Sequence, residues 1–419
     1  MRPLIHTLLT LALACSTTAA DDWPAWRGPQ GNGISRESQA PLHWSSTSGI
    51  VWKTLLEGIG LSSPIVVGDL VFVTSAHADQ NSRHLVCLDR TSGRILWNTP
   101  VFRGKPGTMH KFNTAASSTP VANGDRVFAC FTDDTGLQVC SIDFDGRTLW
   151  SHRVGTFFSN HGFAASPILC ERGLVVNGQQ DGSAFVVMLD RASGEEIWRY
   201  VPDVSLRSFS TPVLTEFAGQ PQLIVTGSTQ TIALDTNTGA RIWSAKGPTE
   251  KFVCTPSVGH GMVFSFGGSP DKKAMAVRLG GTGDVSSTHI AWRNERAMPY
   301  VPSPLLLDDY LHIVNDQGIY TCMEAVSGQV MTTGRKFGPV YSSPVSAAGR
   351  IYLFEDSGAC TVIQAGHAFE ELARNELGEP VQTTPAISGG HLFVRGETHL
   401  YCIGGTSPTA PREMNSDAR

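Results

Sequence analysis

The sequence predicts an all-β fold: an eight-bladed β-propeller of four-stranded antiparallel blades, closed by its N-terminal strand. Three observations carry this prediction: a Ser/Thr-Pro pair that recurs eight times, a Gly-x-x-x-Trp pattern in most repeats, and an unpaired strand before the first repeat. The composition agrees with it. The 419 residues include 43 Gly and 24 Pro but only 16% charged residues, as expected for many short strands joined by tight turns.

The Ser/Thr-Pro pair marks the start of each blade. Its copies are Ser63-Pro64, Thr119-Pro120, Ser166-Pro167, Thr211-Pro212, Thr255-Pro256, Ser303-Pro304, Ser343-Pro344 and Thr384-Pro385. Successive prolines lie 56, 47, 45, 44, 48, 40 and 41 residues apart. A period in the forties is that of a four-stranded propeller blade, so the copies predict eight blades. A parallel β-helix, the competing architecture, would need shorter repeats and no closing strand.

The second pattern is an Asp, a short turn ending in Gly, and a Trp four residues after that Gly. It reads LDRTSGRILW at 88–97, IDFDGRTLW at 142–150, LDRASGEEIW at 189–198 and LDTNTGARIW at 234–243. A weaker copy ends at Trp292, Ser327-Gly328 keeps only the turn, and the copy near 364–372 has decayed. We expect each large Trp ring to pack between neighbouring blades.

Blade two shows how one repeat is expected to fold. Its strands are predicted at 119–122, 126–131, 137–143 and 148–154, with tight turns at 123–125 and 145–146. The last repeat supplies strands near Ala386, at 391–395 and at 399–403, but no fourth strand. Ile50–Leu55 is a Trp-containing strand without a repeat of its own. We therefore expect it to complete blade eight and to hide both sheet edges.

The N-terminus has the features of an export signal over residues 1–20. Arg2 precedes an apolar run from Leu4 to Ala14, and the small residues at 18–20 suit cleavage before Asp21. A lipoprotein signal with Cys15 as the lipidated residue is the alternative. The chain is therefore expected to be periplasmic or extracellular. No later apolar run is long enough to cross a membrane.

The remaining segments complete the predicted organisation of the chain. Residues 21–49 are expected to pack on the propeller, 50–405 to form the eight blades, and 406–419 to be a flexible tail. Within the first segment, the Trp and Arg residues of Trp23–Gly33 would either plug or cap the ring or bind a partner. We expect the protein to be a monomer.

Charge and cysteine content exclude several classes of function. The net charge of -5 lacks the basic excess that nucleic-acid binding requires, so no nucleic-acid partner is predicted. Cys87, Cys140, Cys322 and Cys402 fall at similar points of separate repeats, inside apolar runs, and are expected to be buried thiols. No CxxC, CxxCH or adjacent Cys pair occurs, which argues against c-type haem and common zinc sites.

The Asp-x-x-Ser/Thr-Gly-x-x-x-Trp pattern resembles the pyrroloquinoline-quinone (PQQ) repeat of quinoprotein dehydrogenases and of BamB, the outer-membrane assembly lipoprotein. The segments WPAWRGPQGNG (23–33) and HKFNTAASSTP (110–120) look like those of exported PQQ-like propellers from planctomycete-type bacteria. The resemblance covers residue 23 to about 404. It implies the fold much more specifically than the function, because the repeat is a structural code.

The resemblance leaves the function open between two classes. PQQ-dependent dehydrogenases carry an adjacent Cys pair, calcium ligands and a catalytic Asp; the chain lacks the Cys pair, and no motif matches the other groups. The leading hypothesis is a BamB-like, non-catalytic scaffold that binds a protein or envelope component and needs no cofactor. The alternative is a divergent dehydrogenase that uses PQQ with calcium to oxidise an alcohol or sugar. A third possibility is sugar binding on an aromatic rim.

Candidate site residues come from loops that should share one face of the propeller, around the channel. They are His77, Asp79, His110, Lys111, Asn113, Asn160, His161, Arg207, Lys251, Phe252, Tyr300 and Tyr341. If they converge, Arg207 and Lys251 would oppose carboxylates and an aromatic ring would stack on a flat anion or quinone. If they do not, they form a solvated rim. The spacing of His77, His110 and His161 enforces no metal site, and none is predicted.

Overall fold

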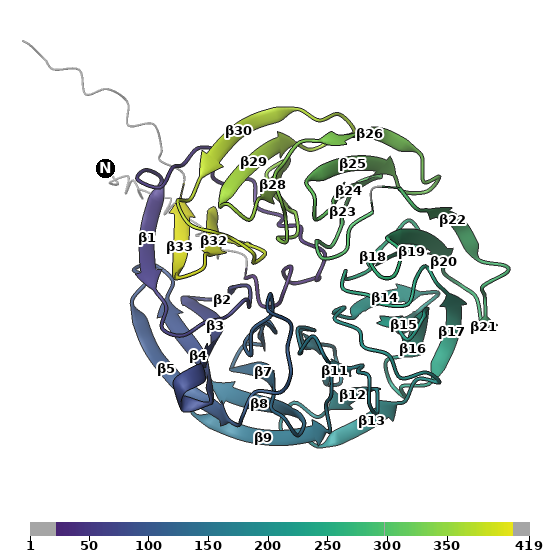
Figure 1. The fold of residues 1–419 in the computed structure, drawn as a ribbon, viewed down its shortest axis with the longest axis horizontal. Coiled ribbons are helices and arrows are strands. Elements are labelled where there is room, and N and C mark those ends of the chain that lie inside the picture. Colours follow the sequence, from purple (N-terminus) through teal and green to yellow (C-terminus); the bar gives the residue numbers. More distant parts are fainter. Residues whose placement is uncertain (1–21, 297, 405–419) are drawn as a thin grey trace, which may run out of the picture.

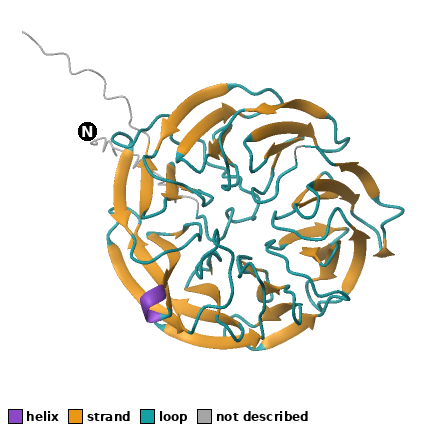
Figure 2. Ribbon diagram, in the orientation of Figure 1, coloured by secondary structure: helices purple, strands orange, loops and turns teal. Residues whose placement is uncertain are grey.

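The computed structural model describes residues 22–296 and 298–404. These residues form eight sheets, antiparallel except for one short parallel pair, arranged around a central axis (Figure 1). The predicted signal peptide and C-terminal tail lie outside the described residues. Within the described residues the one helix is a 3-10 turn, η1 (Ala78–Gln80), and all other regular structure is strand (Figure 2). The predicted eight-bladed propeller is confirmed.

Each of the first four blades runs from the channel outwards in chain order. The strands of blades one and two are β2 (Ile65–Val67), β3 (Leu70–His77), β4 (Ser82–Asp89), β5 (Ile95–Arg103), β6 (Val121–Ala122), β7 (Arg126–Thr132), β8 (Leu137–Asp143) and β9 (Thr148–Gly155). Those of blades three and four are β10 (Ile168–Leu169), β11 (Leu174–Gly178), β12 (Phe185–Leu189), β13 (Glu196–Tyr200), β14 (Val213–Phe217), β15 (Gln220–Gly227), β16 (Gln230–Asp235) and β17 (Arg241–Lys246).

Blades five to eight continue the same order, with two departures. Their strands are β18 (Ser257–Gly259), β19 (Met262–Gly267), β20 (Lys273–Arg278), β22 (Ile290–Asn294), β23 (Leu305–Leu307), β24 (Tyr310–Val314), β25 (Ile319–Glu324), β26 (Val330–Arg335), β27 (Val345–Ala347), β28 (Arg350–Phe354), β29 (Ala359–Gln364), β30 (Glu371–Glu376), β31 (Ala386–Ser388), β32 (His391–Arg395) and β33 (His399–Gly404). First, blade eight takes its outer strand from the N-terminus, β1 (Ile50–Leu55). Second, β21 (Gly283–Asp284) leaves blade five and pairs in parallel with β17 of blade four.

The ring is closed by pairing between the first and last strands of the propeller. β1 runs antiparallel to β33, with Trp52 opposite Cys402 and Leu55 opposite His399. This confirms that Ile50–Leu55 completes blade eight. In blade two the predicted strands agree with the structure to within one residue, except that the inner strand begins at Val121 rather than at Thr119. Thr119 instead forms hydrogen bonds to the neighbouring blades.

These bonds belong to a ring of hydrogen bonds, which we call the hydroxyl ring, around the channel. In each link the backbone N–H of one Ser/Thr-Pro pair donates to the hydroxyl of the pair in the next blade, at 2.9–3.1 Å. The links run Ser63 to Thr119, Thr119 to Ser166, Ser166 to Thr211, Thr255 to Ser303, Ser303 to Ser343, Ser343 to Thr384 and Thr384 to Ser63. The recurring Ser/Thr therefore joins the blades at their inner edge.

The hydroxyl ring is interrupted between blades four and five. The Thr255 hydroxyl is buried and has no hydrogen-bond partner, although the neighbouring Thr211 would complete the link. At the outer edge of the same two blades, β21 adds the parallel pairing with β17. This junction thus lacks the hydroxyl link at its inner edge and gains a strand pairing at its periphery.

The outer-strand tryptophans join the blades at their outer edge. Five of them donate the indole N–H at 2.8–3.1 Å to a backbone carbonyl in the next blade: Trp52 to Arg90, Trp97 to Phe144, Trp150 to Arg191, Trp198 to Thr236 and Trp292 to Ala325. The Gly of the receiving turn lies against the ring. A Cβ at Gly239 would be 2.6 Å from the Trp198 ring, and its φ of +71° also favours glycine. Trp243 differs, since it donates to Gln222 of its own blade.

Residues 22–49, which we call the strap, cross one face of the ring before entering β1 (Figure 1). Trp23 pairs with Val66 of blade one, and Pro24 accepts from Ala122 of blade two. Farther along, Ser35 donates to Ser346 of blade seven, and Glu37 accepts from two backbone N–H groups of blade eight. The strap therefore links the start of the propeller to its end.

Seven of the eight cysteines in the described residues are buried, and Cys170 is half-buried. All eight in the described part of the chain are free thiols, and Cys87, Cys140, Cys322 and Cys402 are buried as predicted. Burial raises the pKa of Cys87 to about 12 and that of Cys140 to about 11. Because the thiolate is the reactive form, these side chains serve packing rather than redox chemistry.

Candidate functional site

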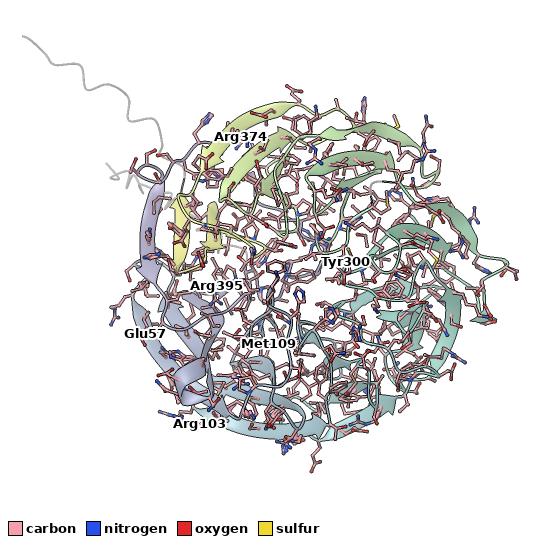
Figure 3. All side chains as sticks on the ribbon, in the orientation of Figure 1. Glu57, Arg103, Met109, Tyr300, Arg374 and Arg395 are labelled. Carbon is pink, nitrogen blue, oxygen red and sulfur yellow. The ribbon has the colours of Figure 1, made fainter. Side chains whose placement is uncertain are left out.

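The loop face carries the loops that lead into the inner strands and the turns that join second and third strands. At its centre lies a cavity of about 570 Å³, which we call the central cavity. The hydroxyl ring and Trp26 of the strap line its base, and loop residues from several blades form its wall. Figure 3 shows Met109 and Tyr300 near the centre of the ring, whereas Glu57, Arg103 and Arg374 lie at its periphery.

One side of the wall is a stacked pair of histidines from blades two and three. The His110 and His161 rings are 5.5 Å apart and 11° from parallel, and Phe209 lies 5.9 Å from His161. The Asn113 side chain fixes this arrangement by donating to the His161 carbonyl at 2.7 Å. The pKa of His161 is lowered, first by burial and then by the charges of Arg207, His110 and Lys251. His161 is therefore neutral at pH 7.

The opposite side of the wall contains an ion pair that sequence analysis did not single out. Lys272 donates to Asp316 at 3.1 Å, and both line the cavity. Asp316 also accepts the backbone N–H groups of Tyr300 and Val301 at 2.9 and 3.0 Å. It lies in the turn between β24 and β25, in the sequence Asn-Asp-Gln-Gly, which alone looks like an ordinary hairpin turn.

Aromatic side chains form the rim of the cavity. Phe112 is 56% exposed and lies 6.2 Å from Tyr341, and both line the cavity together with Tyr300. The Lys111 ammonium lies over the Phe112 ring, 4.9 Å from its centroid. Such a large exposed ring beside a concave surface is typical of a contact site for a ligand or partner.

Arg207 stands behind the histidine pair rather than in the cavity wall. It forms an ion pair with Asp181, and both side chains are largely buried. Its charge nevertheless reaches the cavity. It adds to the burial that lowers the pKa of His161, and it partly offsets the burial that raises the pKa of Tyr300. Lys251 is half-buried and pairs through its backbone with Ser269. Its positive charge also contributes to the lowered pKa of His161.

The other sequence candidates lie away from the cavity lining. His77 stacks on His84 at 4.0 Å, at the end of β3. Asp79 and Asn160 are exposed. Phe252 is fully buried and accepts, through its carbonyl, the Phe209 N–H at 2.9 Å. The structure thus brings together His110, Asn113, His161, Tyr300 and Tyr341, and leaves His77 and Asn160 outside.

Lys272 and Asp316, the charged side chains that line the cavity, pair with each other, and Arg207 behind the wall is paired with Asp181. In residues 22–296 and 298–404, no three His, Cys, Asp or Glu side chains are placed to hold a metal ion. The cavity can therefore offer apolar contact, aromatic stacking and hydroxyl or amide hydrogen bonds, while the two charges in its lining neutralise each other.

The geometry and the repeat define the class of protein: an eight-bladed propeller of PQQ-type repeats. Residues 30–164 and 182–303, more than half of the chain, match the model of the family described as outer membrane protein assembly factor BamB. The chain belongs to this family. No curated protein matched the sequence.

Solved structures confirm the fold at low sequence identity. BamB from Moraxella catarrhalis is 14% identical, with a TM-score of 0.59, over 84% of this chain and 99% of that one. The quinohemoprotein alcohol dehydrogenase from Comamonas testosteroni is 10% identical, with a TM-score of 0.65, over 92% and 81%. A europium-containing methanol dehydrogenase is 13% identical, with a TM-score of 0.54, over 90% of each chain. No helix in the described residues is long and apolar enough to span a membrane.

Proposed function

We propose that this protein is an exported, non-catalytic binding protein that takes a side chain of a protein or cell-envelope component into its central cavity. The observation that carries the proposal is the cavity itself: an aromatic rim over a base of Ser/Thr hydroxyls and Trp26, with the Lys272 and Asp316 charges in its lining paired. An apolar side chain of a partner can therefore be buried there without facing an uncompensated charge in the cavity lining. Aromatic-lined pockets at the centre of an interface are where binding energy concentrates.

The rim fits this role because its rings are large and partly exposed. Phe112 and Tyr341 flank the opening, and His110 extends the aromatic surface towards His161. A neutral His161 places no charge against an apolar side chain at pH 7. Membership of the family described as outer membrane protein assembly factor BamB supports a role in contacting other proteins.

The second candidate is a quinoprotein dehydrogenase, which the two structurally similar dehydrogenases bring into consideration. PQQ carries several carboxylates and is used with calcium, so its site needs free cations and a cluster of oxygen ligands. Around this cavity Lys272 and Arg207 are already neutralised by Asp316 and Asp181. The residues of the central cavity do not fit PQQ with calcium, and no reaction step is assigned to it.

A photo-cross-linking experiment tests the proposal. A photoreactive phenylalanine analogue is placed at position 112, on the rim, and separately at Phe217, which is 39% exposed on β14 at the opposite face. In intact cells, position 112 should cross-link to a discrete envelope partner and position 217 should not. The purified partner should then bind the wild-type protein at least 10-fold more tightly than the Phe112→Ala variant.

Two further measurements separate the competing functions. A saturable rise in thermal stability with PQQ and calcium, together with dye reduction on adding alcohols or sugars, would overturn the binding-protein proposal in favour of an enzyme. Selective binding on a glycan array, abolished by Phe112→Ala, would replace the protein partner with a sugar. Equal cross-linking at positions 112 and 217 would remove the central cavity as the site.

A further inference from the structure

A second cavity lies on the opposite face of the ring, between the strap and the inner strands. Its volume is about 480 Å³, and Trp26 lines both this cavity and the central one. Most of its wall is apolar, with Ile168, Leu169, Leu214 and Leu306 on the ring side. We call it the strap cavity. It shares Trp26 and Thr211 with the central cavity, and the rest of its lining is different.

A buried cation without a counter-ion borders the strap cavity. Arg27 is 1% exposed, and no carboxylate in the described part of the chain forms an ion pair with it. Its guanidinium donates to the carbonyls of Asn32 and Pro304 at 3.1 and 2.8 Å. Burial lowers its pKa to about 10, so it remains charged at pH 7. A buried, charged group of this kind is costly unless an anion compensates it.

Unsatisfied hydrogen-bond donors gather around the same point. Arg27 Nε and the Thr255 hydroxyl are buried without a partner, and both residues line the strap cavity. Thr211, at the interrupted link of the hydroxyl ring, lines it as well. Arg27 lies close enough to Cys254 to alter the pKa of its thiol, and it shares the Pro304 carbonyl with the Ser257 hydroxyl. These contacts place Arg27 and Thr255 in one neighbourhood.

We propose that the strap cavity is a binding site for a singly charged carboxylate with an apolar chain. The carboxylate would neutralise Arg27 and accept from the Thr255 hydroxyl, and the chain would lie against Trp26 and the aliphatic wall. One unpaired cation calls for one negative charge, so a monocarboxylate fits better than a phosphate. Because Arg27 Nε and Thr255 Oγ1 are covered, binding includes a rotation that brings the guanidinium to the cavity surface.

Calorimetric titration of the purified full-length protein with decanoate, below its micelle concentration, tests this site. Decanoate should bind saturably with one site per chain. Decanol and decyltrimethylammonium, which have the same chain without the negative charge, should bind at least 10-fold more weakly. Arg27→Met should weaken decanoate binding at least 10-fold and leave decanol binding within 2-fold.

Two more variants keep the test decisive. Arg395 is a matched control, since it is also buried, has its pKa lowered to about 10 by burial, and bonds to Ser62 and Thr74, none of which lines the strap cavity. Arg395→Met should leave decanoate binding unchanged. If Arg27→Met does not fold, Thr255→Val removes a single hydroxyl and should weaken decanoate about 3-fold or more. Equal affinity for decanoate and decanol, no saturable decanoate binding, or full binding by both Arg27→Met and Thr255→Val would overturn the proposal.

Discussion

The Thr384 backbone N–H donates to the Ser63 hydroxyl at 3.0 Å and so joins two residues that are 321 positions apart in the chain. The same bond joins the other neighbouring blades, except blades four and five, where the bond between the Thr211 N–H and the Thr255 hydroxyl is missing. Each such bond satisfies a buried N–H, and losing the acceptor leaves that N–H without a partner. The position of each Ser/Thr in the hydroxyl ring therefore decides how much its hydroxyl contributes to stability.

We predict that Thr119→Val and Thr255→Val differ sharply in stability. The Thr119 hydroxyl accepts the Ser63 N–H at 2.9 Å, so its loss should cost about 1–3 kcal/mol. The equally buried Thr255 hydroxyl has no partner, so its loss should be neutral or slightly stabilising. Urea unfolding of both variants measures the difference. Equal destabilisation would mean that the ring is continuous in solution.

A second prediction concerns the glycines that face the tryptophans. Gly239 and Gly261 have similar φ values of +71° and +68°, but a Cβ at Gly239 would meet the Trp198 ring whereas one at Gly261 would have open space. Gly261→Ala should cost about 1–2 kcal/mol for the left-handed backbone alone. Gly239→Ala should cost about 1–3 kcal/mol more, because the ring must move. Thermal unfolding compares them, and indistinguishable values would show that the Trp contact adapts freely.

The third prediction tests the strap. The Glu37 carboxylate accepts the N–H groups of Gly389 and Gly390, whereas Glu370 is exposed. Glu37→Gln should lower the free energy of unfolding by about 1–3 kcal/mol, since an amide accepts these bonds less well than a charged carboxylate. Glu370→Gln, the matched control, should change it by less than about 0.5 kcal/mol. Denaturant titration of the two variants is the measurement.

The fourth prediction is a pH dependence at Asp356. Burial is the main cause that raises its pKa to about 6, and Asp316 adds to the rise. The folded protein therefore holds this proton more tightly than the unfolded chain does. Its stabilising effect is complete below pH 4 and is lost as the pH rises from 4 to 6. Asp356→Asn keeps an acceptor for the Tyr341 N–H, bonded now at 3.0 Å, but cannot ionise.

The comparison of wild type with Asp356→Asn isolates this group from all other carboxylates. The wild type should lose stability relative to the variant between pH 4 and 6, and the difference should be constant above pH 7. Unfolding measured across that range at constant ionic strength gives the curve. A difference that grows in the opposite direction would mean that Asp356 is stabilised in its charged form.

The sequence predicted the parts of the fold that repeat. Ser/Thr-Pro pairs and Gly-x-x-x-Trp turns are periodic because they make the contacts between blades, as the Thr119 and Trp198 bonds show. The assignment of Ile50–Leu55 to blade eight followed from the number of strands in each repeat, because the last repeat supplied only three strands. β21 (Gly283–Asp284) was missed, because it follows the Gly-rich segment from Gly280, which has the composition of a loop, and because it pairs with a strand of the neighbouring blade.

The candidate site was predictable only in part. The loop positions within the repeat predicted that His110 and His161 lie on the same face of the propeller. They did not predict that the two rings stack 5.5 Å apart. Lys272 and Asp316 could not be singled out, because their pairing joins blades five and six across 44 residues. His77 shares the loop position of the others, yet it turns to His84 of its own blade. The side-chain direction depends on local neighbours that differ in every repeat.

The pairing of β1 with β33 also sets the order in which the molecule can be completed. On a growing chain β1 is made before any blade, and its partner is made after all of them. Throughout that interval β1 offers an open edge that another chain can occupy. Closure must wait for the last strand, and such a long-range step slows folding. A chain truncated before His399 should therefore accumulate as an open, association-prone ring rather than as a smaller propeller.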